Sequence, residues 1–260
     1  MKTRLVVISF FLFSQVYSFA QDELYNPRPF VIPVHDSKNQ LYLSTGYSFS
    51  IDKGGVDANL SYSLSSRVAV FGAVTYNPFS FKRNSSGNFF DRSFHYDYNN
   101  LCTTFGAEYF KTWPSSFVNI LEAQLGFGYS KYDRLSYATI DGLFDERTEY
   151  NYSRTFFQVS ASKILQHFEL SLALRATFVN FGDYKWYEIS GPGYEEDSQI
   201  ESKFYVEPLL GGSYLIRKIK INLQAGGFMK KYQDNSSGFE TYSISKTLFL
   251  RIAIQYNFLL

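Results

Sequence analysis

Cysteine, histidine and tryptophan are scarce in this chain, which has one, three and two of them respectively. Because Cys102 is the only cysteine, the chain has no intrachain disulfide and no cysteine-based metal site. An excess of charge is absent too, since 25 Lys and Arg stand against 24 Asp and Glu. Nucleic-acid-binding domains present a basic face, so this balance argues against a nucleic-acid partner.

The chain also lacks a long apolar run. The clearest one, residues 5–13, is far shorter than the roughly 20 residues of a membrane-spanning helix. It follows Lys2 and Arg4 and precedes Ser18-Phe19-Ala20, which is the arrangement of a cleaved secretory signal peptide. We therefore expect residues 1–20 to be removed, and no cysteine near that site provides a lipid anchor. The remaining chain has 23 basic and 24 acidic residues.

What the chain does contain is a repeated alternation of apolar and small polar residues. Near the C-terminus, Leu250, Ile252 and Ile254 alternate with Arg251 and Ala253. A period of two places these sets on opposite faces of a strand. Ten such segments cover about 40–51, 56–64, 67–77, 95–111, 117–131, 149–162, 168–180, 202–215, 219–231 and 248–258.

The connections between these segments alternate between short and long. Long ones follow the third, fifth, seventh and ninth segments, whereas the first hairpin is short on that side. An even strand number with short periplasmic turns and long extracellular loops is typical of bacterial outer-membrane barrels. The sequence therefore predicts an all-β, ten-stranded antiparallel transmembrane β-barrel over residues 39–260. Residues 21–38, with Pro27, Pro29 and Pro33, are expected to be an extended periplasmic lead-in.

A soluble, lipocalin-like barrel is the alternative fold, because its strands alternate as well. Its outward face would be rich in Lys and Glu, with apolar side chains inside. Here the polar parity consists of Ser, Gly, Ala, Asn and Gln, which suit a crowded lumen. The 27 Phe and 22 Tyr also fit aromatic girdles at two membrane interfaces.

The sequence does not decide which face of strand 67–77 is turned to lipid, because both of its parities are apolar. At Pro208 we expect a local bulge, since proline removes a hydrogen bond from the ladder.

Three short motifs resemble those of small outer-membrane β-barrel proteins of Bacteroidota. They are Tyr25-Asn26-Pro27 with the later Pro33, Arg67-Val68-Ala69-Val70-Phe71-Gly72, and Val206-Glu207-Pro208. This resemblance implies the same fold and location, and assembly by the outer-membrane insertion machinery. The last strand departs from the usual pattern, because Phe258 is followed by Leu259 and Leu260.

Charged residues on the inward parity are the candidate site of the lumen. Strand positions place them in one layer of its periplasmic half. They are Glu108, Glu122, Arg175, Glu207 and Arg251. Charges in a narrow lumen must pair, so we expect an ion-paired plug that fixes strand register. A gate or selectivity ring is the alternative, but a ten-stranded barrel should be mostly filled by side chains.

An enzymatic function would require a catalytic base, and the three histidines are the candidates. His35 lies in the lead-in and His167 at a periplasmic turn, away from the outer rim. His95, with Asp97, falls near that rim, and Asp57 or loop acids are within its expected reach. This makes an omptin-like hydrolase with His95 and Asp97 the enzyme hypothesis, although a His beside an Asp is usually a solvated pair.

The long loops provide the remaining candidates. Their acids, Asp141, Asp145, Glu146, Glu195, Glu196 and Asp197, fit no calcium-ligand pattern, so we expect no metal and no cofactor. Tyr184, Trp186, Tyr187 and Tyr194 make the loop 181–201 aromatic-rich. The favoured function is a structural or surface-interaction role through these loops, with membrane lipid and lipopolysaccharide as partners and a surface ligand left undefined. A narrow passive channel is second, and the outer-rim hydrolase third.

Overall fold

The computed structural model describes residues 35–50, 54–85, 92–114, 116–138, 145–188, 195–199, 202–227, 229–233, 240–244 and 249–259. The predicted signal peptide, and the lead-in as far as residue 34, lie outside these ranges. Within them, no helix is long and apolar enough to cross a membrane.

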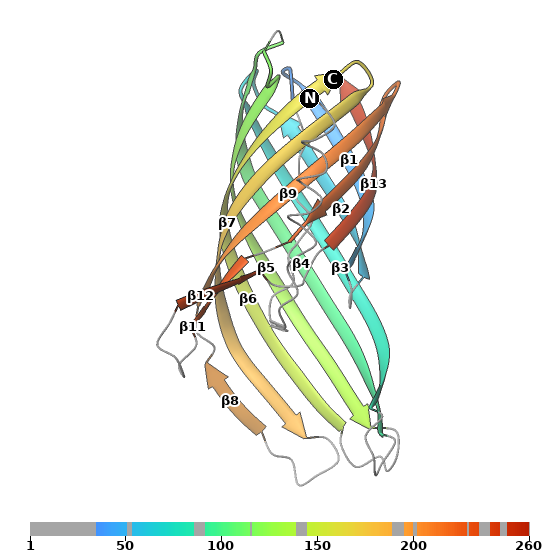
Figure 1. Ribbon diagram of the computed structural model, residues 1–260, viewed down its shortest axis with the longest axis vertical. Helices are drawn as coiled ribbons and strands as arrows, with labels where there is room; N and C mark the ends of the chain where they lie inside the picture. Colours follow the sequence, from blue (N-terminus) through green and yellow to red (C-terminus); the bar gives the residue numbers. More distant parts are fainter. Residues whose placement is uncertain are drawn as a thin grey trace.

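Ten antiparallel strands close into a barrel (Figure 1). Closure is made by β1 and β13, which pair from Gln40↔Leu259 to Ser50↔Phe249. The wall consists of β1 Gln40–Ser50, β2 Gly54–Ser63, β3 Val68–Ser85, β4 Arg92–Thr112, β5 Ile120–Ala138, β6 Asp145–Leu165, β7 Phe168–Glu188, β9 Lys203–Ile216, β10 Ile219–Gly226 and β13 Phe249–Leu259. Three short strands complete the sheet: β8 Glu195–Gln199, β11 Met229–Gln233 and β12 Glu240–Ile244. The predicted ten-stranded antiparallel fold is confirmed.

The alternating residues of each strand lie on opposite faces of the barrel wall, one toward the lumen and one away from it. On β2, Val56 and Leu60 are about half exposed on the outer face, whereas Asp57 and Ser61 are buried in the lumen. The same rule holds on β7, where Leu172 is 63% exposed. An apolar outer face over a polar interior is the reverse of a soluble barrel and is what a bilayer requires.

Strand β3, whose facing the sequence left open, follows the same rule. Val68, Val70 and Val74 are exposed, and Phe71 is buried in the lumen. The Phe71 ring packs against Phe156 with ring centroids 6.3 Å apart. It also fills the space that a Cβ on Gly106 would need, because that atom would lie 2.5 Å from the ring. An apolar side chain is therefore tolerated inside because a glycine on the next strand makes room for it.

The hairpins at one end of the barrel are longer than the sequence predicts. Pairing of β3 with β4 continues to Ser85↔Arg92, and pairing of β5 with β6 reaches Tyr137↔Asp145. Strand β7 runs to Glu188 and pairs there with β8. The loops predicted at 78–94, 132–148 and 181–201 are thus largely strand. Beyond the lipid both faces of a strand contact water, so the hydrogen-bonded ladder continues where the apolar alternation has ended.

Pro208 interrupts the ladder without the expected bulge. It faces Leu174 of β7 in a continuous register. On its other side, β10 pairs with β9 as far as Gly226↔Leu209, and β11 resumes the same register at Met229↔Val206. β10 and β11 therefore pair with β9 in one register. Between them the Gly227 N–H donates to the Pro208 carbonyl at 3.3 Å, while proline has no N–H to donate in return. A register shift does occur between Tyr150 and Tyr152, where β6 pairs with β7.

Candidate functional site

The five charged residues predicted for the lumen all lie on inward faces. Their exposed fractions are 3% or less. They come from five strands: Glu108 from β4, Glu122 from β5, Arg175 from β7, Glu207 from β9 and Arg251 from β13. The strands bring them into one filled interior, but their described partners are mostly not one another.

Arg251 pairs with Asp57, the residue that was expected within reach of His95. The Arg251 Nε lies 2.9 Å from Asp57 Oδ2, and Nη2 lies 2.5 Å from Oδ1. Both residues are buried. In register, Arg251 is opposite Ser48 of β1 and Asp57 is opposite Gly46, so the contact runs diagonally across β1. This two-point contact crosses the seam where the barrel closes, so it holds the last strand to the first hairpin.

Arg175 lies against neutral groups and an aromatic face. Its Nε and Nη2 donate to Gln158 Oε1 at 3.1 and 2.9 Å, and its guanidinium carbon lies 4.4 Å from the centre of the Phe156 ring. Glu207 is directly opposite Arg175 in the β7–β9 register and accepts a hydrogen bond from Thr177. The planar guanidinium suits both an amide oxygen and a ring face, which a lysine at this position would not.

Glu108 and Glu122 lie beside each other on β4 and β5, and each repels the charge of the other. Each also has a neutral hydrogen-bond partner. Gln124 Nε2 donates to Glu108 at 3.1 Å, and Ser160 Oγ donates to Glu122 at 2.7 Å. Amides and hydroxyls therefore take part in the polar network of the lumen, together with the Arg251–Asp57 pair.

Three further charged residues of the lumen were not singled out from the sequence. Lys220 of β10 pairs with Glu169 of β7, Nζ to Oε2 at 2.8 Å, and both are nearly buried. Arg154 of β6 donates from Nη2 to Thr104 Oγ1 at 2.7 Å. All three charged residues lie at inward-facing positions of their strands. The alternation of apolar and polar residues in the sequence was therefore sufficient to identify them.

The chain ahead of β1 closes one end of the lumen. His35 is fully buried, with its ring centroid 4.7 Å from Tyr42 and 5.6 Å from Phe110, and its Nε2 lies 2.7 Å from Ser61 Oγ. Burial lowers the pKa of His35 from 6.5 to about 4, and nearby Lys220 lowers it further while Asp36 opposes the shift. At least from His35 onward, the predicted periplasmic lead-in enters the barrel mouth.

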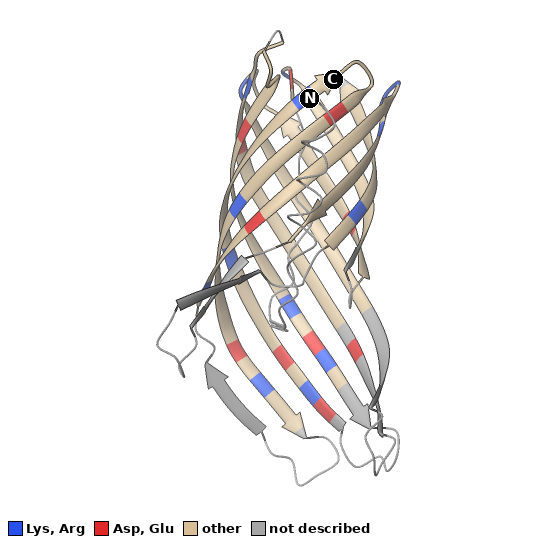
Figure 2. Ribbon diagram, in the orientation of Figure 1, with Lys and Arg blue, Asp and Glu red and all other residues tan. Residues whose placement is uncertain are grey.

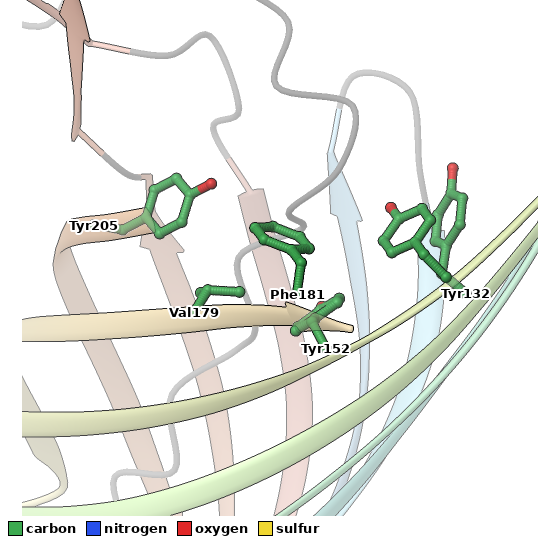
Figure 3. Packing of buried hydrophobic residues seen from close by; sticks show 6 residues of the cluster. Tyr132, Tyr152, Val179, Phe181 and Tyr205 are labelled. Atoms are coloured by element: carbon green, nitrogen blue, oxygen red, sulfur yellow. The ribbon is translucent and has the colours of Figure 1, made fainter. Parts of the chain in front are cut away.

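Aromatic side chains pack together in the other half of the lumen (Figure 3). Tyr132 and Tyr150 stack at 4.4 Å, and Phe181 lies 5.7 Å from Tyr152. Tyr184, predicted to be in an aromatic-rich loop, instead belongs to β7 and packs on Tyr150. The buried members of this aromatic cluster are Tyr132, Tyr150, Tyr152, Val179, Phe181 and Tyr205.

Asp57 does not belong to the rim where His95 was expected to act. Asp57 is level with Thr75 of β3 and, through it, with Cys102 of β4, seven residues along the strand from His95. At about 3.3 Å per residue it is out of reach, and it is bound to Arg251. Asp97 lies on the outward parity of β4, and the His95 side chain is outside what the structure describes.

The acids predicted for the loops lie mostly in strands. Asp145 and Glu146 belong to β6, and Glu195, Glu196 and Asp197 belong to β8. Asp141 falls outside the described residues. No group of three or more His, Cys, Asp or Glu among the described residues is placed to hold a metal ion.

Breaking the seam pair should destabilise the barrel strongly. Arg251→Leu leaves the Asp57 carboxylate buried without its cation, and Asp57→Leu leaves the guanidinium, so each should cost about 3–5 kcal/mol. The double variant should cost clearly less than the sum of the two. Urea unfolding of the refolded barrel measures all three, and additive losses would show that the two side chains do not interact.

Acid should weaken the fold through His35. The folded state keeps this ring neutral down to pH of about 4, while the unfolded chain binds its proton near 6.5. The contribution is therefore present above pH 6.5 and is lost as the pH falls towards 4, by up to about 3 kcal/mol. Urea unfolding between these pH values should show a shallower pH dependence for His35→Gln. Parallel curves for the two proteins would contradict the assignment.

No protein-family model matches the chain, and no curated protein matches it in sequence. Solved structures do match in fold. The outer membrane protease OmpT from Escherichia coli has a TM-score of 0.53 at 9% identity, over 85% of this chain and 94% of that one. The translocator domain of the autotransporter NalP from Neisseria meningitidis has a TM-score of 0.53 at 8% identity, over 87% of this chain and 90% of that one. At such identities the likeness establishes the fold, which is that of an outer-membrane β-barrel.

Proposed function

We propose that this protein resides in the outer membrane of a Gram-negative bacterium and acts there through its extracellular end, with a structural or surface-interaction role. The apolar outer face of the strands supports the location. The fold shared with OmpT and the NalP translocator agrees with it. In this orientation, the end where β1 starts and β13 finishes is periplasmic. Lipid and lipopolysaccharide then surround the barrel, and the insertion machinery assembles it.

The burial of side chains inside the lumen is the observation that supports a function at the ends of the barrel instead of transport through it. His35, Tyr42 and Phe110 occupy its periplasmic end, and the aromatic cluster occupies its outer half. Between them lie the Arg251–Asp57 pair and the groups bound to Arg175. Buried side chains at these three levels support the proposal that the lumen is not a route for solutes.

The extracellular extension supplies a surface instead. Strands β4 to β7 project well beyond β1 and β2, with β8 at their edge (Figure 1). Acidic and basic residues gather on this extension, whereas they are sparse along the wall (Figure 2). Arg147 bridges Asp133 at 2.9 Å and Glu149 at 2.7 Å on its outer face. A rigid, charge-patterned sheet above the membrane is suited to contact with other surface molecules.

A narrow passive channel is the second candidate. Its support is the charged layer itself, because Arg175, Glu207 and Arg251 line the lumen and would meet any solute that passed. The hydrolase is not proposed, since Asp57 is held by Arg251 and Asp97 is on the outward parity.

Surface labelling of intact cells tests the location and orientation. In a Cys102→Ala background, a cysteine replacing Lys185 on the extension should react with a membrane-impermeant maleimide. A cysteine replacing Lys218, in the turn between β9 and β10, should react only after the outer membrane is permeabilised. The opposite pattern would reverse the orientation, and labelling of neither after permeabilisation would contradict exposure of both sites.

Planar-bilayer recording separates the surface role from the channel. The refolded mature chain should be electrically silent, because its lumen is filled. Stable openings that change in an Arg175→Ala/Arg251→Ala variant would favour the channel and overturn the closed lumen. A Lys131→Ala/Lys185→Ala variant removes the same number of positive charges outside the lumen and is the matched control. Heat-modifiable migration on gels should show that every variant is folded.

A further inference from the structure

We propose that a ring of basic residues at the periplasmic rim binds the headgroups of anionic phospholipids in the leaflet that faces the periplasm. This inference rests on the proposed outer-membrane location. The ring, called here the basic collar, consists of Arg67, Lys111, Lys163, Arg217 and Lys218.

Exposed acid is scarce where the collar lies. In the turns between β2 and β3, β4 and β5, β6 and β7, and β9 and β10, the described residues include no Asp or Glu. Asp36, in the chain ahead of β1, is exposed but is bound by Gln40 and lies two residues from Lys38. The opposite end is mixed in sign, with Arg147 held between Asp133 and Glu149. The collar is therefore a local excess of positive charge on a chain that is nearly neutral overall.

Large apolar side chains are exposed beside these cations. Phe117, in the turn between β4 and β5, is 89% exposed, and Trp113 in the same turn lies 4.7 Å from Lys111 Nζ. Lys163 Nζ donates to the Ser116 carbonyl of that turn at 2.8 Å. The other turns repeat this pairing of apolar and basic groups, with exposed Leu64, Leu165, Phe168, Ile216 and Ile219. Aromatic rings and long basic side chains at this level are suited to the membrane interface.

The geometry of the collar favours a leaflet over a soluble partner. Its residues lie in turns (Arg67, Arg217, Lys218) and at the rim ends of strands (Lys111 of β4, Lys163 of β6) that are spread around the barrel. One globular protein would not cover them together, whereas a membrane surrounds the whole rim. The collar also continues the apolar belt of the wall, which sets its cations at the depth of the phosphates. A basic residue near an anionic lipid surface gains about fivefold in affinity, and salt screens this attraction.

The chain offers a built-in probe, because it has only two tryptophans, Trp113 and Trp186. In a Trp186→Phe protein, Trp113 reports on the lipids beside the collar. The barrel is placed in vesicles of equal parts phosphatidylglycerol and phosphatidylcholine, with bromine carried on one lipid or the other. We expect stronger quenching by brominated phosphatidylglycerol at low salt, and a loss of this preference at high salt.

Variants assign the preference to the collar. Lys111→Gln/Lys163→Gln should lower the preference for phosphatidylglycerol, by about fivefold for each charge. Lys131→Gln/Lys185→Gln, at the other end, should leave it unchanged. Because the readout is a ratio between two lipids, an altered intrinsic fluorescence of Trp113 cancels.

Equal quenching by both lipids at low salt would overturn the inference while leaving the membrane location in place. Quenching by neither lipid would overturn both. If the double variant does not fold, the wild-type protein with its salt series still decides the question.

Discussion

The rest of this structure depends on the closure of the sheet between β1 and β13. In a bilayer no water is available to the backbone, so each N–H and C=O must find a partner within the protein. An open sheet would leave two edges unpaired, and eleven residue pairs between β1 and β13 remove them. Closure in turn fixes which face of each strand meets lipid, because a shift by one residue would turn every apolar side chain into the lumen. The Arg251–Asp57 contact lies across this seam and holds the same register from inside.

Closure also creates an interior that must be filled with groups that tolerate one another. A ten-stranded lumen is too narrow for an open channel of water but too wide for small side chains alone. The chain solves this by pairing size across strands. Phe71 lies over Gly106, and the Phe156 ring occupies the space above Gly126. Charges are also paired across strands. Lys220 of β10, for example, forms an ion pair with Glu169 of β7. The filling is therefore part of the fold as well as an obstacle to transport.

Much of the fold was accessible from the sequence because lipid imposes a strict period of two. The ten strands and their facing follow from that period. The predicted positions of the strand ends were wrong, because water contacts both faces of a strand there and the period of two is lost. β3 and β7 continue through residues that were predicted to be loop. The bulge expected at Pro208 was wrong, because β9 keeps a continuous register with β7 through this residue. In the lumen, inward orientation was predictable for Glu108, Glu122, Arg175, Glu207 and Arg251, whereas their partners depend on register between distant strands. Asp57 illustrates this, since it is 194 residues from the arginine it binds.

A filled lumen separates the two ends of the molecule, and this shapes what the protein is able to do. A barrel that conducts must couple its ends through one path, so its specificity lies in the layer of narrowest passage. In this barrel, Arg175 packs inside the lumen against Gln158 and the Phe156 ring. The extracellular sheet carries both signs of charge in ion pairs, while the periplasmic rim carries basic and apolar groups. The two leaflets of an outer membrane differ in the same sense, because lipopolysaccharide phosphates are bridged by divalent cations and phospholipid headgroups are not. In the proposed outer-membrane location, the two rims of the barrel therefore meet different lipid chemistry, and the interactions that we propose lie at these rims.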